Sequence, residues 1–187
     1  MSDDAARRRS ARRNLLAIAA VAMFPFVGSF IAYLVWKPAG FVNYGDLITP
    51  IPLAGAAAPR ALQDLKGKWV FLMVDAGACD EYCRRKLYVM RQVRLTQGKD
   101  QDRVERAWLV DDGAAVPADV QRDYDGTLWI DAEGNDLPAR LAAGGSARDH
   151  LFIVDPLGNV ILRYPRDADP SRVKKDLTRL LKASRIG

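Results

Sequence analysis

The chain has 187 residues and a formal net charge of +5. Seven charged residues stand near the N-terminus: Arg7, Arg8, Arg9, Arg12, Arg13, Asp3 and Asp4. Without them the chain carries 23 basic and 21 acidic residues, so its main part is nearly neutral. A nearly neutral body gives no reason to expect nucleic acid as a partner. The basic cluster is better explained as a signal that sets membrane topology.

An almost uncharged run extends from Leu15 to Trp36. Its 22 residues are enough to cross a hydrocarbon core of about 30 Å at about 1.5 Å per residue. Five arginines precede the run and the single Lys37 follows it, which predicts that the N-terminus stays in the cytoplasm. Tyr33 and Trp36 are then expected at the far membrane interface, where aromatic side chains are enriched. The sequence thus predicts a single-pass anchor.

The alternative is a signal peptide that is cleaved after export. The apolar run is longer than the apolar segment of a typical signal peptide, and no small-x-small cleavage site follows it. Both observations favour the anchor. In both cases residues 38–187 leave the cytosol, as in a protein of the bacterial inner membrane with a periplasmic domain. The predicted organisation is a cytoplasmic tail (1–14), a transmembrane helix (15–36), a linker (37–60) and a periplasmic domain (61–187).

The first half of the exported part contains one buried strand and one helix. The linker is rich in Pro, Gly and Ala, with a short strand expected near residues 44–48. One turn over 62–65 precedes a continuous apolar run over 69–75, which is typical of a strand buried on both faces. A helix is predicted from Asp80 to about Gln97, because acidic residues open it and apolar residues then recur at helical spacing.

The second half predicts a sheet and a final helix. The remaining elements are a strand over 104–110, a loop or short helix over 117–124, a weak strand over 127–130, a short helix over 137–143, and strands over 151–154 and 160–164. The turn Asp155-Pro156-Leu157-Gly158-Asn159 joins the last two strands as a hairpin. Pro170 opens an amphipathic helix. This order predicts an α/β fold with a mixed central sheet flanked by helices.

The only two cysteines, Cys79 and Cys83, lie where the buried strand meets the helix. A purely structural disulfide is one interpretation, since an exported chain with two cysteines invites one. A bridge that closes so few residues stabilises little, however, which favours a redox or metal function. Asp75, at the end of the apolar strand, is either a buried proton acceptor for a thiol or a cap for the following turn.

The order of strand, cysteine pair, helix, strand, hairpin and final helix looks like the thioredoxin fold. The segment Gly67-Lys68-Trp69-Val70-Phe71-Leu72 precedes a C-x3-C pair, and the single histidine, His150, stands directly before the hairpin strand. This combination resembles the Sco (SenC) family of membrane-anchored, copper-binding proteins that assist assembly of cytochrome c oxidase. The resemblance covers roughly residues 60–182. Asp80 replaces the proline that usually follows the first cysteine, so the chain is expected to be a divergent member.

The resemblance implies one copper ion, Cu(I) or Cu(II), bound by Cys79, Cys83 and His150. Two thiolates and an imidazole suit copper, most clearly Cu(I), with zinc as the usual competitor. The loop before the hairpin strand of such a sheet comes close to the cysteine helix, so His150 is expected to reach the sulfurs. Asp149 or a backbone carbonyl is expected to fix the tautomer of the histidine. The implied partners are the membrane and the copper-site subunit of a respiratory oxidase or its other assembly factors.

Two other functions remain open, and the sequence does not decide whether the chain is an enzyme. A thiol–disulfide oxidoreductase would use Cys79 as the attacking thiolate and Cys83 as the resolving cysteine, without His150. A non-catalytic thioredoxin-like docking module would need neither cysteine.

Overall fold

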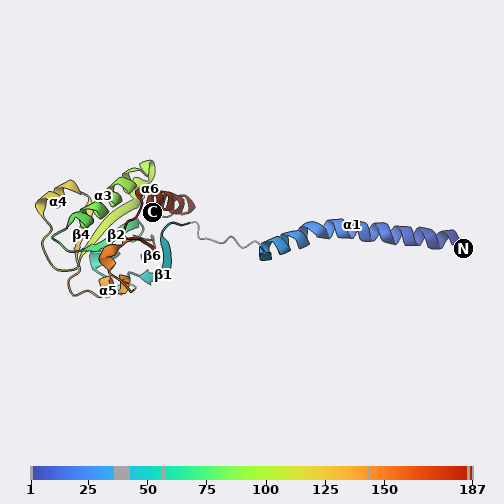
Figure 1. Ribbon diagram of the computed structural model, residues 1–187, viewed down its shortest axis with the longest axis horizontal. Helices are drawn as coiled ribbons and strands as arrows, with labels where there is room; N and C mark the ends of the chain where they lie inside the picture. The colour runs from blue at the N-terminus through green and yellow to red at the C-terminus, as the bar shows by residue number, and fades with distance from the viewer. Residues whose placement is uncertain (1, 36–42, 56–57, 143, 185, 187) are drawn as a thin grey trace. The chain divides into compact units, whose positions relative to one another are not determined.

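The structure is a computed structural model that describes residues 2–35, 43–55, 58–142, 144–184 and 186. The chain forms two compact units, residues 1–41 and 42–187 (Figure 1). The first contains a single helix, α1 (Ser2–Val35). The second contains all the strands and the remaining helices.

The part of α1 from Arg12 to Val35 is 24 residues long. Among the described residues it is the one helix whose length and apolar composition suffice to cross a membrane, and none of this stretch is buried within the structure. A long apolar helix that the other described residues do not bury matches the predicted anchor in both length and composition. Trp36, predicted as an interfacial residue, lies outside the described residues.

The second unit is built on a six-stranded mixed sheet with the strand order β1-β6-β5-β2-β3-β4. The strands are β1 (Asp46–Pro52), β2 (Trp69–Asp75), β3 (Val104–Val110), β4 (Thr127–Asp131), β5 (Leu151–Val154) and β6 (Asn159–Tyr164). β2, β3 and β4 run parallel, whereas β5 is antiparallel to both β2 and β6. β2 lies between β5 and β3 with all seven residues buried, which explains its continuous apolar sequence.

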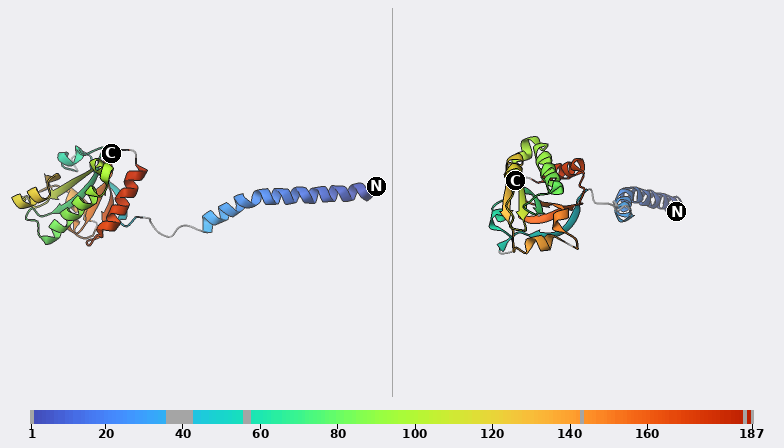
Figure 2. Two further views of the ribbon diagram at one scale, coloured as in Figure 1. Left: turned by 90° about the horizontal axis from the view of Figure 1, so that it is seen from above. Right: turned by 60° about the vertical axis from the view of Figure 1, so that its left-hand side comes forward.

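The helices cover the two faces of this sheet (Figures 1 and 2). They are α2 (Arg60–Gln63), α3 (Glu81–Leu95), α4 (Ala118–Asp123), α5 (Leu137–Leu141) and α6 (Pro170–Ala183), with 3-10 turns η2 (Gly98–Arg103) and η3 (Ala147–Asp149). α3, α4 and α6 contribute to one core cluster together with Phe71 and Met73 of β2. α2, α5 and η3 contribute to a second cluster with Leu72 and Val74. Because side chains alternate along a strand, the two clusters lie on opposite faces of the sheet.

The predicted thioredoxin-like fold, a mixed sheet flanked by helices, is confirmed. Each strand and helix expected after residue 68 is present, within a few residues of its predicted bounds. The short strand expected near residues 44–48 is β1, which lies within the predicted linker. It extends to Pro52 and pairs with β6 as an edge strand. Prolines at positions 50 and 52 are tolerated there because an edge strand leaves some N–H groups without a partner strand.

The strand registers place the start of β1 at a defined end of the sheet. Asp46 pairs with Arg163 near the end of β6, and Tyr164 pairs with Leu151. Leu151 in turn pairs with Met73 near the end of β2. The chain therefore joins the sheet at the end where β2 finishes and the cysteine pair begins.

Candidate redox and metal site

A tight turn carries the chain from β2 to Cys79. The N–H of Cys79 donates to the carbonyl of Ala76 at 3.1 Å. Cys79 has a φ of +50°, and it is the one non-glycine residue with a positive φ in the described part of the chain. This left-handed conformation costs an L-residue about 1–2 kcal/mol. The turn therefore holds its cysteine in a strained backbone geometry, as is common at functional sites.

Asp80 starts α3 directly after this cysteine. Its carboxylate accepts a hydrogen bond of 2.8 Å from the N–H of Cys83, which is an N-cap interaction. The left-handed turn before the cap brings Cys79 over the first turn of the helix. The two cysteines form a disulfide with their Cα atoms 5.1 Å apart. Both are buried, at 4% and 0% exposure, within the core cluster on the α3 face.

The loop after β3 clamps the cysteine turn from the side. One carboxylate oxygen of Asp112 accepts from the N–H of Gly77 at 2.9 Å and from that of Ala114 at 3.1 Å. These backbone donors lower the pKa of the Asp112 carboxyl. A Cβ at Gly77 would lie 2.0 Å from the carbonyl oxygen of Ala114. The neighbouring Asp111 accepts two hydrogen bonds from Arg148 of η3, at 2.8 and 3.0 Å.

Lys86 lies on α3, about one helical turn after Cys83. Its side chain is only 3% exposed, and its Nζ is 2.8 Å from Oδ2 of Asp75, which is 9% exposed. The same ammonium donates to the carbonyls of Val74 at 2.9 Å and of Arg148. Burial lowers the pKa of Lys86, and the Asp75 carboxylate opposes that shift. Lys86 thus connects the cysteine helix to the end of β2 and to the turn before His150.

Asp75 also caps the turn that follows β2. Its Oδ1 accepts from the N–H of Ala76 at 2.9 Å, while its Oδ2 faces Lys86. The two interpretations from the sequence were a proton acceptor and a turn cap. The structure supplies the capping bond and adds an ion pair that the sequence analysis did not anticipate.

His150 lies at the cysteine end of the sheet, but its ring is not on the cysteine face. Its Nδ1 is 2.8 Å from the carbonyl oxygen of Tyr164, and its ring lies edge-on to Phe152 with centroids 6.1 Å apart. Phe152 belongs to the core cluster on the face opposite the disulfide. A carbonyl only accepts, so the proton of a neutral imidazole sits on Nδ1 and leaves the Nε2 lone pair free. In the described residues, no group of three or more His, Cys, Asp and Glu side chains is placed to hold a metal ion.

Asp149, the other predicted support of the histidine, has a different partner. Its carboxylate pairs with Arg166 at 3.0 Å, while its carbonyl accepts from the hydroxyl of Tyr82 at 2.9 Å. Tyr82 lies between the cysteines, and burial raises its pKa to about 12. The residue that orients His150 is therefore Tyr164, through its backbone, whereas Asp149 anchors the turn to α3.

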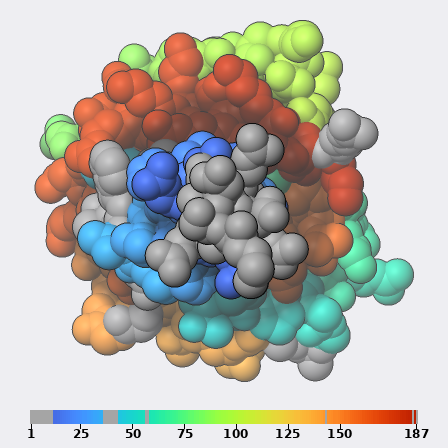
Figure 3. All heavy atoms as spheres, turned by 90° about the vertical axis from the view of Figure 1, so that its right-hand side faces the viewer, coloured from blue at the N-terminus to red at the C-terminus, as the bar shows by residue number. Residues whose placement is uncertain are grey.

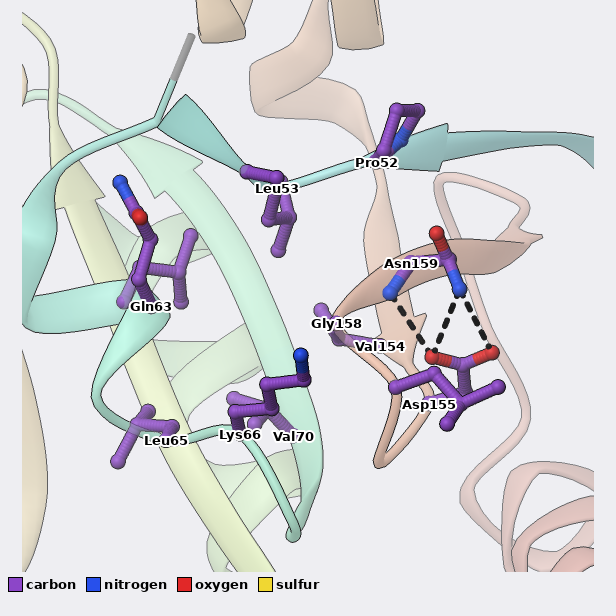
Figure 4. A pocket seen from close by; sticks show the side chains of 13 residues that line it. Pro52, Leu53, Gln63, Leu65, Lys66, Val70, Val154, Asp155, Gly158 and Asn159 are labelled. Carbon is purple, nitrogen blue, oxygen red and sulfur yellow. Dashed lines mark hydrogen bonds between the residues drawn. The ribbon is translucent and has the colours of Figure 1, made fainter. Parts of the chain in front are cut away.

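Two cavities of the folded unit differ in their distance from the cysteine pair. One, of about 370 Å³, borders α3 and the β6–α6 loop and is lined by Tyr82, Tyr88, Arg166 and Pro170 among others. Another, of about 230 Å³, lies at the opposite end of the sheet. Figure 4 shows its apolar side chains Leu53, Leu65, Val70 and Val154, with Asp155 bonded to Asn159 at its rim. Neither cavity is lined by a cysteine or by His150.

Lys86, Gly77 and the Asp111–Asp112 pair support the site but are not predicted from the sequence. For Lys86 a signal was present, because it occupies an apolar position of α3 beside Cys83 and Leu87. A charged residue at such a position needs a buried partner, and Asp75 at the end of an apolar strand needs one too. The role of Gly77 and of the aspartates depends on how the loops pack, and no local pattern encodes that.

The fold and the site define a thioredoxin-like domain with a disulfide at the start of its first long helix. Residues 69–184 match the family model described as the transmembrane-like, thioredoxin-like, C-terminal domain, and the chain belongs to that family. Among curated proteins, none matches the chain.

Solved structures of Sco proteins share the fold. The chain is similar to apo Sco1 from Thermus thermophilus, with 18% identity and a TM-score of 0.52 over 78% of this chain and 98% of that one. It is also similar to yeast Sco1 with copper bound, with 14% identity and a TM-score of 0.53 over 78% of this chain and 96% of that one. The predicted resemblance to the Sco family is thus confirmed at the level of the fold.

Proposed function

We propose that this protein is a membrane-tethered thiol–disulfide oxidoreductase, and that Cys79 and Cys83 cycle between a disulfide and two thiols as they exchange with client cysteines. The observation that carries the proposal is the Cys79–Cys83 disulfide at the start of α3. Helix N-termini favour thiolate, the reactive form of cysteine. α1 is the proposed anchor, and residues beyond it are proposed to lie in the periplasm.

One exchange needs the reduced cysteine pair and a client disulfide, and a dithiol donor has to reduce the pair again before the next exchange. In the reducing direction, the Cys79 thiolate attacks a client disulfide, and one client sulfur leaves as a thiolate and takes up a proton. The Cys83 thiolate then attacks the sulfur of Cys79 and releases the second client thiol. Two electrons have passed to the client, and the protein holds its disulfide again. Both sulfurs are buried, so the strained turn at residues 76–79 has to open for exchange.

The redox proposal predicts a reducible pair. We expect thiol trapping of the full chain in membranes, equilibrated with glutathione buffers, to show a two-thiol transition at a potential above about −300 mV. We expect Cys83→Ser to accumulate mixed disulfides with client proteins through Cys79, because the resolving thiol is gone. Cys79→Ser serves as the matched control and should trap far less. A cysteine pair that stays oxidised under all these conditions indicates a structural disulfide. A double Cys→Ser variant that still complements a deletion of the gene in cells indicates a docking module.

A second candidate is copper delivery during assembly of a respiratory oxidase, as in the Sco resemblance. It is supported by the C-x3-C pair, by His150 at the same end of the sheet, and by the Tyr164 carbonyl that leaves Nε2 of the histidine free. The three side chains do not converge in this oxidised arrangement. Copper binding by all three would require reduction of the disulfide and movement of the imidazole to the other face.

The copper candidate has its own prediction. We expect the reduced full chain to bind one equivalent of Cu(I) in competition with a chelator, and Cys83→Ala to abolish tight binding. His150→Ala should weaken binding if the imidazole becomes a ligand, while leaving the redox transition of the cysteines intact. Equal Cu(I) binding by the wild type and Cys83→Ala would remove this candidate and leave thiol exchange.

A further inference from the structure

One surface of α6 is strongly basic. Its exposed cations are Arg172, Lys174, Lys175, Arg179 and Lys182. Its one acidic residue, Asp176, is buried at 1% exposure. The spacing of positions 172, 175, 179 and 182 follows the helical repeat, so these four form a stripe along the helix, which we call the basic stripe. Figure 3 shows α6, in red, along one side of the folded unit.

The basic stripe borders the place where the chain from α1 joins the folded unit. The N–H groups of Tyr44 and Gly45 donate to the carboxylate of Asp176, at 2.8 and 2.9 Å. The guanidinium of Arg172 stacks on the ring of Tyr44 at 3.9 Å, and Arg179 pairs with Asp176 at 3.6 Å. Arg172 therefore contacts Tyr44 itself, and Arg179 contacts the Asp176 carboxylate that holds the backbone of Tyr44 and Gly45.

Chain geometry limits how far this place can be from the end of the anchor. Eight residues, 36–43, separate the last residue of α1 from Tyr44. Fully extended, eight residues span at most about 30 Å. If α1 crosses the membrane, Tyr44, on which Arg172 of the basic stripe stacks, lies within about 30 Å of the end of the anchor.

We propose that the basic stripe of α6 binds the anionic phospholipid headgroups of the membrane that carries the anchor. This inference rests on the membrane tether in the proposed function. Clustered lysines and arginines next to a membrane span are attracted to anionic lipids, and each one adds to the attraction. An acidic protein is the competing partner, but the chain itself supplies a bilayer within reach, whereas no acidic protein surface is supplied. Binding along α6 fixes one side of the domain against the membrane.

Lysine labelling of the full chain in lipid nanodiscs tests the proposal. Acylation rates of the two stripe lysines, Lys175 and Lys182, are compared between phosphatidylcholine discs and discs that also contain phosphatidylglycerol. In the anionic discs we expect the acylation rates of these lysines to fall by at least about threefold. High salt should remove this protection. Lys66, exposed near α2 on the other face of the sheet, should react equally in both.

Charge-reversal variants distinguish an effect of the basic stripe from an effect of the net charge of the protein. Lys175→Glu should weaken the protection of the reporter Lys182, whereas Lys66→Glu, with the same change in net charge, should leave it intact. Equal labelling of α6 in both discs overturns the proposal. Protection that appears only in native membranes and not in anionic discs also overturns it, in favour of an acidic protein. Failure to co-elute with discs at all refutes the anchor itself, whereas thiol trapping in solution reports separately on the redox function.

Discussion

Replacing Lys86 by methionine is expected to lower the free energy of unfolding by about 3–5 kcal/mol, because it leaves the buried Asp75 carboxylate without its counter-ion. The carbonyls of Val74 and Arg148 lose their donor at the same time. The loss should appear as a fall of roughly 10 °C or more in the unfolding temperature of the full chain in detergent, followed by tryptophan fluorescence. Amides of η3 should also exchange hydrogen faster, since Lys86 no longer holds that turn to α3.

The matched control is the double variant Asp75→Asn/Lys86→Met. Asparagine keeps an Oδ1 that accepts from Ala76 but carries no charge, so no unpaired buried carboxylate remains. We expect the double variant to recover most of the stability that the single variant loses. A single variant that loses less than about 1 kcal/mol would show that the pair behaves like a solvent-exposed one.

A second large effect is expected for Gly77→Ala. The added Cβ would lie 2.0 Å from the carbonyl oxygen of Ala114 and 2.6 Å from its carbonyl carbon, which are backbone atoms that cannot rotate away. Either the cysteine turn or the Asp112 loop has to move, at a cost of about 3 kcal/mol. Because the turn carries Cys79, the change should also shift the reduction potential of the disulfide. Thermal unfolding and thiol trapping of the same preparation measure the two effects together.

Gly145→Ala is the matched control for this substitution. A Cβ at Gly145 would meet its first neighbour, the carbonyl oxygen of Ala142, only at 3.9 Å. We expect it to leave both the unfolding temperature and the reduction potential nearly unchanged. Similar behaviour of the two variants would mean that the close approach of the turn and the Asp112 loop is not maintained in solution.

The sequence predicts the elements of this fold well because their signals are local. The six consecutive apolar residues of β2 favour a strand covered on both faces, and the turn at residues 155–159 specifies a hairpin. The amphipathic pattern after Pro170 specifies α6. β1 was placed only roughly, since an edge strand with two prolines carries little strand signal.

The arrangement of the site could not be predicted to the same depth, and His150 shows why. Its position next to a strand is readable, but the face on which its ring lies depends on register. A shift of one residue exchanges the two faces of a strand. Likewise, the sequence places Cys79 one residue before a helix cap, but not the positive φ that turns it toward Cys83. Contacts between loops distant in sequence, such as Asp112 with Gly77, carry no local signal at all.

The attachment of the proposed tether at the cysteine end of the sheet bears on which proteins this domain can serve. If α1 is the membrane anchor, the eight-residue linker limits how far the sulfurs can lie from the lipid, so thiols of membrane-bound proteins would meet them at a raised local concentration. Freely diffusing proteins would gain nothing from this linker. Client proteins would therefore be selected by their location rather than by a recognition sequence. Lengthening the linker should broaden the range of proteins that form mixed disulfides with the domain.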